Sequence, residues 1–304
     1  MRALVTGGNR GLGLECVKVL LEAGCDLVFM GCRDEAAGRL LACSLADTYG
    51  DRVLALQLDV TSPRSLAAAA DVVRATNAPR DDGHNDIPQS FVDILVNNAG
   101  VLLESHEDGQ KDVAARRTLA VNVYGAIDAT EAFLPLLGPQ ARVLNVSSSV
   151  GTRTHGRLTE EDRAAIEAPD VDEAALRSLA AAMVARVEDA THPYCRMPTP
   201  AYGLSKCLLN AYTRLLARKR PDLRVNACSP GFCHTGMSGP LRAGGRVPKS
   251  AALGATVFKH VLFTDLGADK TDTFFKQASA PGTPLDDATS KVDPWVTEPP
   301  GPLG

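Results

Sequence analysis

Short apolar runs alternate with longer amphipathic patterns along most of this chain, and no other feature constrains its fold as strongly. A strand, a helix and a second strand in succession form a βαβ unit, which places the two strands parallel in one sheet. The expected strands are 3–6, 27–30, 53–58, 91–96, 142–146 and 223–227. The expected helices are 12–21, one that begins at Asp34, 63–76, 113–137 and 201–218. The pattern predicts an α/β protein built on a parallel sheet.

The alternation fits one domain rather than two. The 304 residues are 45% hydrophobic and 22% charged, which is the composition of an ordinary globular protein. Every expected strand falls within residues 1–277, so we predict a single Rossmann-type, doubly wound α/β domain there. A tail rich in Pro and Gly follows at 278–304, and the polar residues 78–86 are expected to form a loop.

Composition and charge exclude several classes of function. With 32 Lys plus Arg against 36 Asp plus Glu, the chain lacks the basic surface of a general nucleic-acid-binding protein. It has no apolar run of about 18 residues, which excludes a membrane span, and its first residues do not have the pattern of a signal peptide. The eight cysteines form no C-x-x-C pair. We therefore expect free thiols, no metal site and a cytoplasmic location.

A glycine-rich turn follows the first expected strand, where residues 6–13 read T-G-G-N-R-G-L-G. Glycines in such a turn let a pyrophosphate approach the backbone, and the following helix directs its N-terminal N–H groups at the negative charge. In this strand–turn–helix context the motif predicts a dinucleotide site. Its expected contacts are Gly7, Asn9, Arg10, Gly11, Leu12 and Gly13.

The end of the second expected strand bears on the choice between NAD and NADP. An NAD site offers a carboxylate to the ribose 2′-hydroxyl, whereas an NADP site offers cations to a 2′-phosphate. Cys32 stands at that position and Arg33 follows it, with Arg10 in the glycine-rich turn. Guanidinium groups bind phosphate through paired hydrogen bonds. Although Asp34 adds a competing negative charge, the pattern favours NADP(H).

Four more motifs follow in order: N-N-A-G at 97–100, N-V-S-S-S at 145–149, Y-G-L-S-K at 202–206 and P-G at 230–231. Together with the glycine-rich turn, this ordered set resembles the short-chain dehydrogenase/reductase family. The resemblance covers about residues 1–277. It implies the doubly wound fold predicted above and hydride transfer between a nicotinamide cofactor and a small carbonyl substrate.

The resemblance also implies which residues do the chemistry. The family's Y-x-x-x-K pair falls on Tyr202 and Lys206, which the i,i+4 spacing places on one helix face. Its serine falls on Ser148, with Ser147 as the alternative because three serines adjoin, and its asparagine falls on Asn122. Tyr202 would protonate the alkoxide formed by hydride addition, and Lys206 would lower the pKa of Tyr202 and bind the nicotinamide ribose. Ser148 would hold the carbonyl oxygen, and Asn122 would keep a water that relays protons toward Lys206.

Other contacts follow from the same resemblance. Phe232 and Met237 are candidates for lining the substrate pocket beside Ser148, although packing of their loop explains them nearly as well. Cys233 would lie beside the cofactor, either as a reactive or as an inert thiol. The remaining implied cofactor contacts are Asp59 and Val60 at the adenine, Asn98, Ala99 and Gly100 after the fourth strand, and Pro230, Gly231 and Thr235 at the nicotinamide end.

The number of residues between Ser148 and Tyr202 in the sequence indicates which subfamily the chain resembles. They are 54 positions apart, whereas most members of the family place them much closer. The excess is the segment 152–200, whose length is similar to that in the carbonyl reductases, where an inserted helix covers the tetramer surface and leaves a monomer. Four apolar residues would seat such a helix, namely Leu176, Leu179, Met183 and Val187.

We therefore expect a monomeric NADPH-dependent carbonyl reductase that reduces aldehydes, ketones or quinones. Three alternatives stay open at this point. The inserted helix could bind a partner protein, the enzyme could be a steroid-type alcohol dehydrogenase, or the chain could be a catalytically idle NADP(H)-binding sensor or scaffold. A pteridine reductase is disfavoured, because Gly11 and Ser148 stand where those enzymes carry arginine and aspartate.

Overall fold

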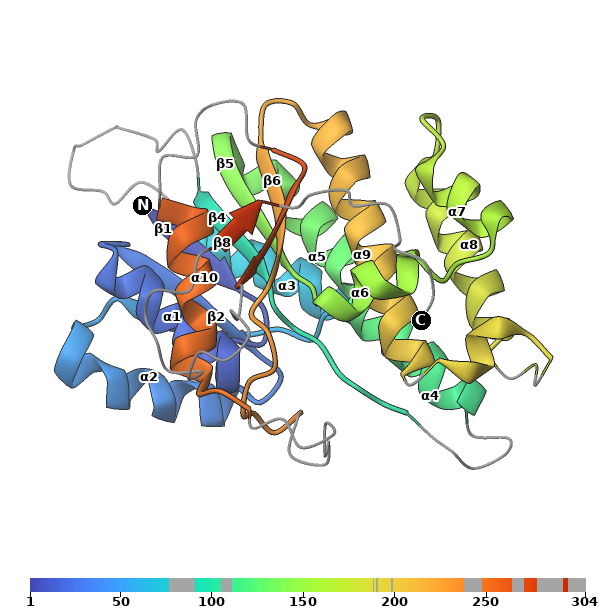
Figure 1. Ribbon diagram of the computed structural model, residues 1–304. Helices are drawn as coiled ribbons and strands as arrows, with labels where there is room; N and C mark the ends of the chain where they lie inside the picture. Colours follow the sequence, from blue (N-terminus) through green and yellow to red (C-terminus); the bar gives the residue numbers. More distant parts are fainter. Residues whose placement is uncertain are drawn as a thin grey trace.

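The computed structural model describes residues 1–76, 91–104, 111–187, 189, 191–197, 199–237, 248–263, 271–277 and 292–294. The loop expected at 78–86 and most of the tail expected at 278–304 lie outside the described residues. Within them the chain forms a central sheet flanked by helices on both faces, as the alternation predicts (Figure 1).

The sheet is doubly wound. It contains β1 Arg2–Val5, β2 Leu27–Cys32, β3 Val53–Gln57, β4 Val92–Asn97, β5 Leu137–Val146, β6 Arg224–Ser229, β7 Thr273–Gln277 and β8 Val292–Pro294. Their order is β3-β2-β1-β4-β5-β6-β7-β8, with β1 to β7 parallel and β8 antiparallel to β7. The winding reverses between β1 and β4, which is where open α/β sheets bind ligands. β8 comes from the segment expected to be a tail.

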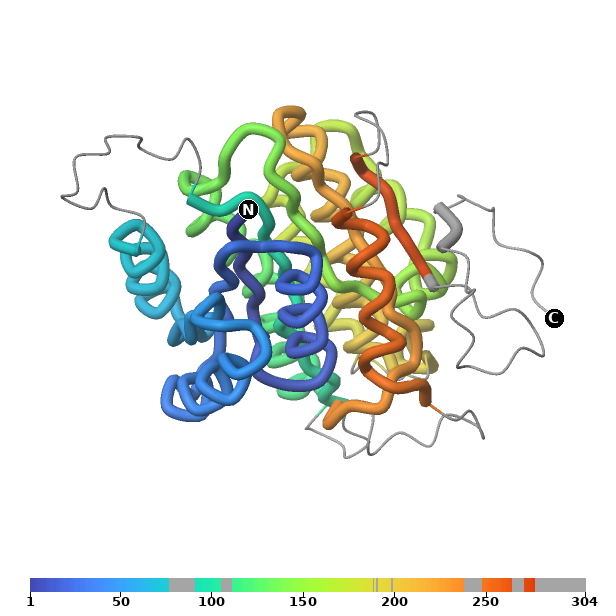
Figure 2. Tube along the Cα trace, turned by 90° about the vertical axis from the view of Figure 1, so that its left-hand side faces the viewer, coloured from blue at the N-terminus to red at the C-terminus, as the bar shows by residue number. Residues whose placement is uncertain are grey.

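Two layers of helices cover the sheet. The helices are α1 Gly11–Glu22, α2 Glu35–Tyr49, α3 Pro63–Thr76, α4 Lys111–Leu119, α5 Gly125–Phe133, α6 Ser149–His155, α7 Glu160–Glu167, α8 Glu173–Ala185, α9 Pro200–Lys219 and α10 Ala251–Phe263. α1 and α10 lie side by side over one face (Figure 2), and α3, α5 and α9 cover the other. Ala3 and Val5 pack toward α1 and α10, whereas Leu4 packs toward the second layer. Burial on both faces explains why the strands read as continuous apolar runs.

The helix expected over 113–137 is interrupted. It runs as α4, a π-helical turn at Ala120–Tyr124 and α5, and a 3-10 turn at Leu134–Leu136 ends it. β5 then begins at Leu137, five residues before the expected strand. Pro135 lacks an N–H and disfavours a continued helix, which accounts for the early end.

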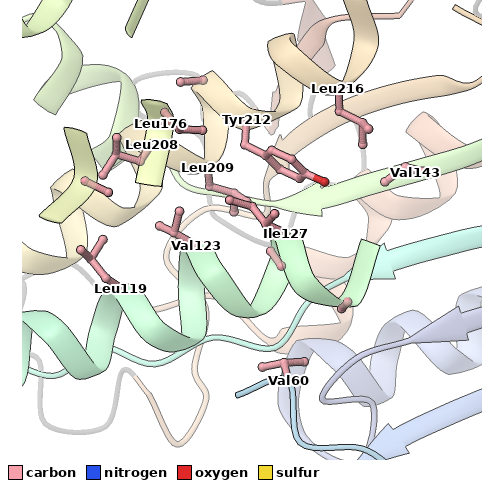
Figure 3. Close-up of a cluster of buried hydrophobic side chains, with 14 of the residues drawn as sticks. Val60, Leu119, Val123, Ile127, Val143, Leu176, Leu208, Leu209, Tyr212 and Leu216 are labelled. Carbon is pink, nitrogen blue, oxygen red and sulfur yellow. The ribbon is translucent and has the colours of Figure 1, made fainter. Parts of the chain in front are cut away.

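The segment 152–200, predicted to be an insertion, contains the end of α6, then α7, α8 and a 3-10 turn at Pro193–Arg196. α7 and α8 lie outside α9 (Figure 1). Leu176, Met183 and Val187 are buried and Leu179 is half-buried, so the apolar stripe seats α8 as predicted. Figure 3 shows Leu176 in the cluster that also contains Leu208 of α9. Among the helices of the described residues, none has both the length and the apolar character that crossing a bilayer requires.

Candidate active site

The turn after β1 is shaped for the close approach of a ligand. Gly7 and Gly11 have φ values of 63° and 52°, in the left-handed region that favours glycine. A Cβ on Gly13 would lie 2.2 Å from the carbonyl oxygen of Gly7. The N-cap residue of α1, Arg10, makes no side-chain hydrogen bond to the helix, and the first turn contains no acidic residue. The N-terminal N–H groups of α1 are therefore suited to bind an anion such as a pyrophosphate.

The loop after β4 holds this glycine-rich turn in place. It lies on the other side of the point between β1 and β4 at which the winding of the sheet reverses. Asn98 Nδ2 donates hydrogen bonds to the carbonyl oxygens of Thr6 and Gly7, at 2.9 and 3.0 Å. The N–H groups of Asn98 and Ala99 both donate to Thr6 Oγ1, at 3.0 and 2.9 Å. Gly100 continues the loop and is half-buried. The structure thus brings Asn98 and Ala99 against the glycine-rich turn, which the side chain of Asn98 holds, whereas a Cβ on Gly100 would lie 3.4 Å from Asn122 Oδ1 and 3.7 Å from Lys206 Nζ.

Two exposed arginines lie near the end of β2, where the 2′-phosphate of NADP(H) is expected. Cys32 is 1% exposed and its Sγ donates to the carbonyl oxygen of Asp34 at 3.2 Å. The Asp34 carboxylate accepts a hydrogen bond from Ala37 N at 3.0 Å and so caps α2. This cap engages the negative charge that would otherwise oppose the binding of a phosphate. Arg10 and Arg33 are exposed, and neither forms an ion pair with a carboxylate within the described part of the chain.

Asp59 and Val60, which are expected to contact the adenine, differ in which of their groups a ligand can reach. Asp59 is half-buried, and its Oδ1 accepts from Thr61 N and Thr61 Oγ1, at 2.9 and 2.7 Å. Val60 is 6% exposed and belongs to the core, where its Cγ2 would lie 2.7 Å from a Cβ on Gly125. Only the backbone of Val60 is therefore available to a ligand.

The turn after β6, which is expected to contact the nicotinamide, lies against the turn after β1. Gly231 has a φ of 81°, and a Cβ on Gly11 would lie 3.3 Å from Cγ2 of Thr235, so this turn approaches the turn after β1. Cys233 points the other way: it is 4% exposed and its Sγ donates to the carbonyl oxygen of Pro230 at 3.4 Å. Burial raises the pKa of Cys233 to about 11, which favours the inert thiol over the reactive one.

The other predicted contact residues are half-buried or exposed. Asn9 and Leu12 are half-buried in the glycine-rich turn and the start of α1. Phe232 is half-buried and Met237 is 37% exposed. Residues 238–247, which follow Met237, lie outside the described residues.

Close packing of α6 on α9 brings the predicted catalytic residues together. A Cβ on Gly151 of α6 would lie 2.8 Å from the carbonyl oxygen of Lys206, and a Cβ on Gly203 of α9 would lie 2.4 Å from Thr154 Oγ1. Any larger residue at either glycine would separate the two helices. Since Ser148 caps α6 and Tyr202 lies in the first turn of α9, this contact sets the distance between them.

The structure separates the two candidate serines. Ser148 is half-buried, accepts from Val150 N at 3.2 Å and forms a hydrogen bond with Tyr202 that lowers the pKa of the phenol. Ser147 is 4% exposed, and its Oγ donates to the carbonyl oxygen of Lys206 at 3.3 Å. The geometry therefore places Ser148, and not Ser147, against Tyr202.

Burial governs the protonation of Tyr202 and Lys206. It raises the pKa of Tyr202 to about 12, and the hydrogen bond from Ser148 offsets this only in part. The lowering of this pKa by Lys206, expected from the resemblance, is not seen in the cofactor-free protein, where burial outweighs every other effect. Lys206 Nζ lies 5.7 Å from the centre of the Tyr202 ring and donates to the carbonyl oxygen of Val146 at 2.7 Å. Burial also lowers the pKa of Lys206, to about 8. The pair thus consists of a neutral phenol and an ammonium that can lose its proton at mildly alkaline pH.

Asn122 lies on the π-helical turn between α4 and α5 and is 1% exposed. Its Oδ1 accepts from Val101 N at 2.8 Å, and its Nδ2 donates to Val101 O at 2.9 Å and to Ser205 Oγ at 3.0 Å. The side-chain amide of Asn122 is therefore engaged in hydrogen bonds with the loop after β4 and with α9. Any proton relay at this position has to use the main chain, and π-turns of this kind are frequent at functional sites.

Comparison with known proteins matches this arrangement to a family. A model of the short chain dehydrogenase family matches residues 1–159, which contain the glycine-rich turn, the loop after β4 and the serine motif. The chain belongs to the short-chain dehydrogenase/reductase family. It is therefore an oxidoreductase that binds a nicotinamide cofactor, and the glycine-rich turn fits the pyrophosphate of such a cofactor.

Individual relatives agree with the family assignment. Carbonyl reductase (NADPH) 1 of Mus musculus is 31% identical over 300 residues, which cover 96% of this chain and 98% of the relative. Carbonyl reductase (NADPH) 1 of Bos taurus is 32% identical over 244 residues, which cover 78% of this chain and 83% of the relative. The structure of salutaridine reductase from Papaver somniferum has a TM-score of 0.73 and 28% identity, and covers 90% of this chain and 98% of that one.

One residue that sequence reasoning missed lies beside the family's tyrosine. Glu104 Oε1 accepts a hydrogen bond from the backbone N–H of Tyr202 at 2.9 Å, across 98 positions of sequence. Burial raises the pKa of Glu104 to about 6, and hydrogen bonds from the N–H groups of Tyr202 and Ala201 partly counter this effect. No motif contains Glu104, so only the tertiary structure reveals the contact.

Proposed function

We propose that this protein is an NADPH-dependent reductase that converts the carbonyl groups of aldehydes, ketones or quinones to alcohols. The observation that carries the proposal is the placement of Tyr202, Ser148 and Lys206 at the same edge of the sheet as the glycine-rich turn. Relatives whose names specify NADPH and carbonyl reduction, at about one-third identity over most of the chain, support it.

The cofactor would be held by three parts of the chain. Gly7, Gly11 and Gly13 with the N-terminus of α1 would bind the pyrophosphate, and Arg10 and Arg33 would bind the 2′-phosphate, because both guanidinium groups are exposed. Lys206 would bind the nicotinamide ribose. NADPH, once bound, supplies the hydride.

Tyr202 is the proposed general acid. Its phenol is protonated at neutral pH, since the ordinary pKa of tyrosine is 10 and burial raises that of Tyr202 to about 12, so a proton is available as negative charge develops on the substrate oxygen. Ser148 donates a hydrogen bond to the same oxygen, and the Lys206 ammonium stabilises the phenolate that remains on Tyr202. We assign the relay of a replacement proton to the main chain at Asn122, whose amide is occupied.

We further propose a cytoplasmic monomer. No disulfide bond joins the cysteines in the described part of the chain, as is usual in a reducing compartment. α8 packs on α9 through buried Leu176 and Met183, and so covers a face of the domain that would otherwise be free for assembly.

The test of this function is the oxidation of NADPH by the purified protein in the presence of menadione and aromatic ketones. We expect turnover with NADPH and at least tenfold weaker turnover with NADH, because charge-assisted hydrogen bonds to a 2′-phosphate contribute about 1.5–3 kcal/mol each. Equal use of both cofactors would contradict the role of Arg10 and Arg33. Tight NADPH binding without turnover on any carbonyl compound would instead indicate a sensor or scaffold.

A further inference from the structure

We infer that Glu104 is a positioning residue for Tyr202: its side chain holds the first turn of α9 and thereby fixes the phenol for proton transfer. The inference rests on the proposed function, in which Tyr202 is the general acid. It assigns a role to a side chain outside every sequence motif.

The start of α9 has no local cap. Its first residue is Pro200, which carries no N–H, and the N-cap residue Thr199 makes no side-chain hydrogen bond. The first turn contains no acidic residue. The N–H groups of Ala201 and Tyr202, which cannot bond within the helix, therefore need an acceptor from elsewhere.

Glu104 is that acceptor. Its Oε1 lies 2.9 Å from Tyr202 N, and it also accepts from Ala201 N. A carboxylate at this end of a helix is favoured by the helix dipole as well as by the hydrogen bonds. The cap therefore acts directly on the backbone of Tyr202, the third residue of the helix.

The loop that carries Glu104 is itself fixed to the site. Asn122 binds both the N–H and the carbonyl of Val101, three residues before Glu104. Asn122 also donates to Ser205 Oγ, which in turn donates to the carbonyl oxygen of Tyr202 at 2.8 Å. The backbone of Tyr202 is thus held at its N–H by Glu104 and at its carbonyl by Ser205. Removal of one support leaves the phenol free to shift, and a displacement of about 1 Å can slow a reaction about 100-fold.

The experiment compares Glu104→Ala and Glu104→Gln with the wild-type protein. An alanine removes the acceptor, whereas glutamine keeps an acceptor oxygen without the charge. Asp172→Ala is the matched control, because Asp172 caps α8 in the same way: its Oδ1 accepts from Ala175 N at 2.8 Å, also the third residue of its helix. Each variant is assayed for kcat, for KM of NADPH and for amide hydrogen exchange in the peptide that spans 200–206.

We expect Glu104→Ala to lower kcat at least tenfold with KM for NADPH changed less than twofold, and to speed exchange of the Ala201 and Tyr202 amides about fivefold, as expected for a lost cap. Glu104→Gln should restore kcat to within about threefold of wild type, and Asp172→Ala should leave kcat and this peptide unchanged. A kcat within twofold of wild type in Glu104→Ala, or a Glu104→Gln variant as slow as Glu104→Ala, would overturn the inference.

Amide exchange requires no turnover, so the two proposals can fail separately. If the wild-type protein reduces no carbonyl compound, the proposed function fails, and faster exchange at Tyr202 in Glu104→Ala still supports the cap. Unchanged exchange in that variant would refute the cap whatever the activity.

Discussion

Burial of the Lys206 ammonium, a group of the proposed active site, lowers the stability of the folded protein. Lys206 is 5% exposed, and this burial lowers the pKa of its ammonium from an ordinary value of 10.5 to about 8. A group whose charged form is disfavoured in the folded state weakens folding wherever it is charged. Here that effect is complete below pH 8 and disappears as the pH rises from about 8 to 10.5.

We therefore expect Lys206→Met to unfold at higher urea concentration than the wild type at pH 7. One pKa unit corresponds to about 1.4 kcal/mol, and the variant also loses the hydrogen bond to Val146, so we expect a net gain on the order of 2 kcal/mol. The difference should shrink toward zero at pH 10. Cofactor-free protein unfolded in urea at both pH values provides the measurement, and a variant less stable than wild type at pH 7 would contradict the account.

At the same scale, sequence reasoning finds side chains that belong to motifs and misses those that act through the fold. Tyr202, Lys206 and Ser148 follow from residue type and order. Glu104 does not, because it reaches Tyr202 from 98 positions away. Cys233 is predicted to lie beside the cofactor, but its side chain is buried and donates to the carbonyl oxygen of Pro230, which a single sequence does not reveal.

A buried network holds together the segment 152–200, which is predicted to be an insertion. Asp162 of α7 is 3% exposed and accepts hydrogen bonds from the Tyr194 hydroxyl and from Arg186. Burial acts to raise the pKa of Asp162, but the hydrogen bonds from Tyr194, Arg186 and Thr159, together with the positive charge of Arg186, outweigh it and the pKa is lowered. The carboxylate is therefore ionised at neutral pH, and its Oδ2 accepts both hydrogen bonds.

Asp162→Ala should loosen the insertion without loss of cofactor binding. It leaves Tyr194 and Arg186 without their partner, which costs about 2–4 kcal/mol for a buried, hydrogen-bonded charge pair. We expect faster amide exchange and proteolysis within 160–187, and a dissociation constant for NADPH within about twofold of wild type. Glu167→Ala is the control, since its ion pair with His155 is largely exposed and contributes about 1 kcal/mol or less. Equal exchange in the two variants would contradict the role of the network.

Elements are predictable where their pattern is regular. The spacing of apolar residues predicts α3 with the observed bounds and predicts the buried stripe of α8. The π-helical turn at Ala120–Tyr124 escapes prediction, because one extra residue per turn hardly changes the apolar spacing. α7 escapes as well, because its first turn carries three acidic residues and only Ile166 of its apolar side chains reaches the core.

For the whole molecule, the parallel sheet explains why motif order alone predicts the site. Strands β1 to β7 run in the same direction, so the segments that follow β1, β4, β5 and β6 all emerge at one edge. The motifs occupy those segments and must therefore meet. The pairing of β8 with β7 could not be foreseen, since a three-residue strand in a segment rich in Pro and Gly has no distinctive pattern.

The packing of α8 on α9 predicts the assembly state. Because α8 buries Leu176 and Met183 against the domain, we expect light scattering at micromolar concentration to give the chain mass of 32.0 kDa. A mass two or four times larger would show that the insertion leaves the assembly surface open.

The most direct test of the central claim is the effect of Tyr202→Phe on carbonyl reduction. The change removes the phenol oxygen and keeps the ring, so the variant should bind NADPH with a dissociation constant within about twofold of wild type. A positioned general acid contributes roughly 100-fold to 10,000-fold, and we predict that kcat for a ketone falls by at least 100-fold at pH 7. A variant that keeps more than a tenth of wild-type kcat, with NADPH bound as tightly, would contradict the assignment of Tyr202 as the acid.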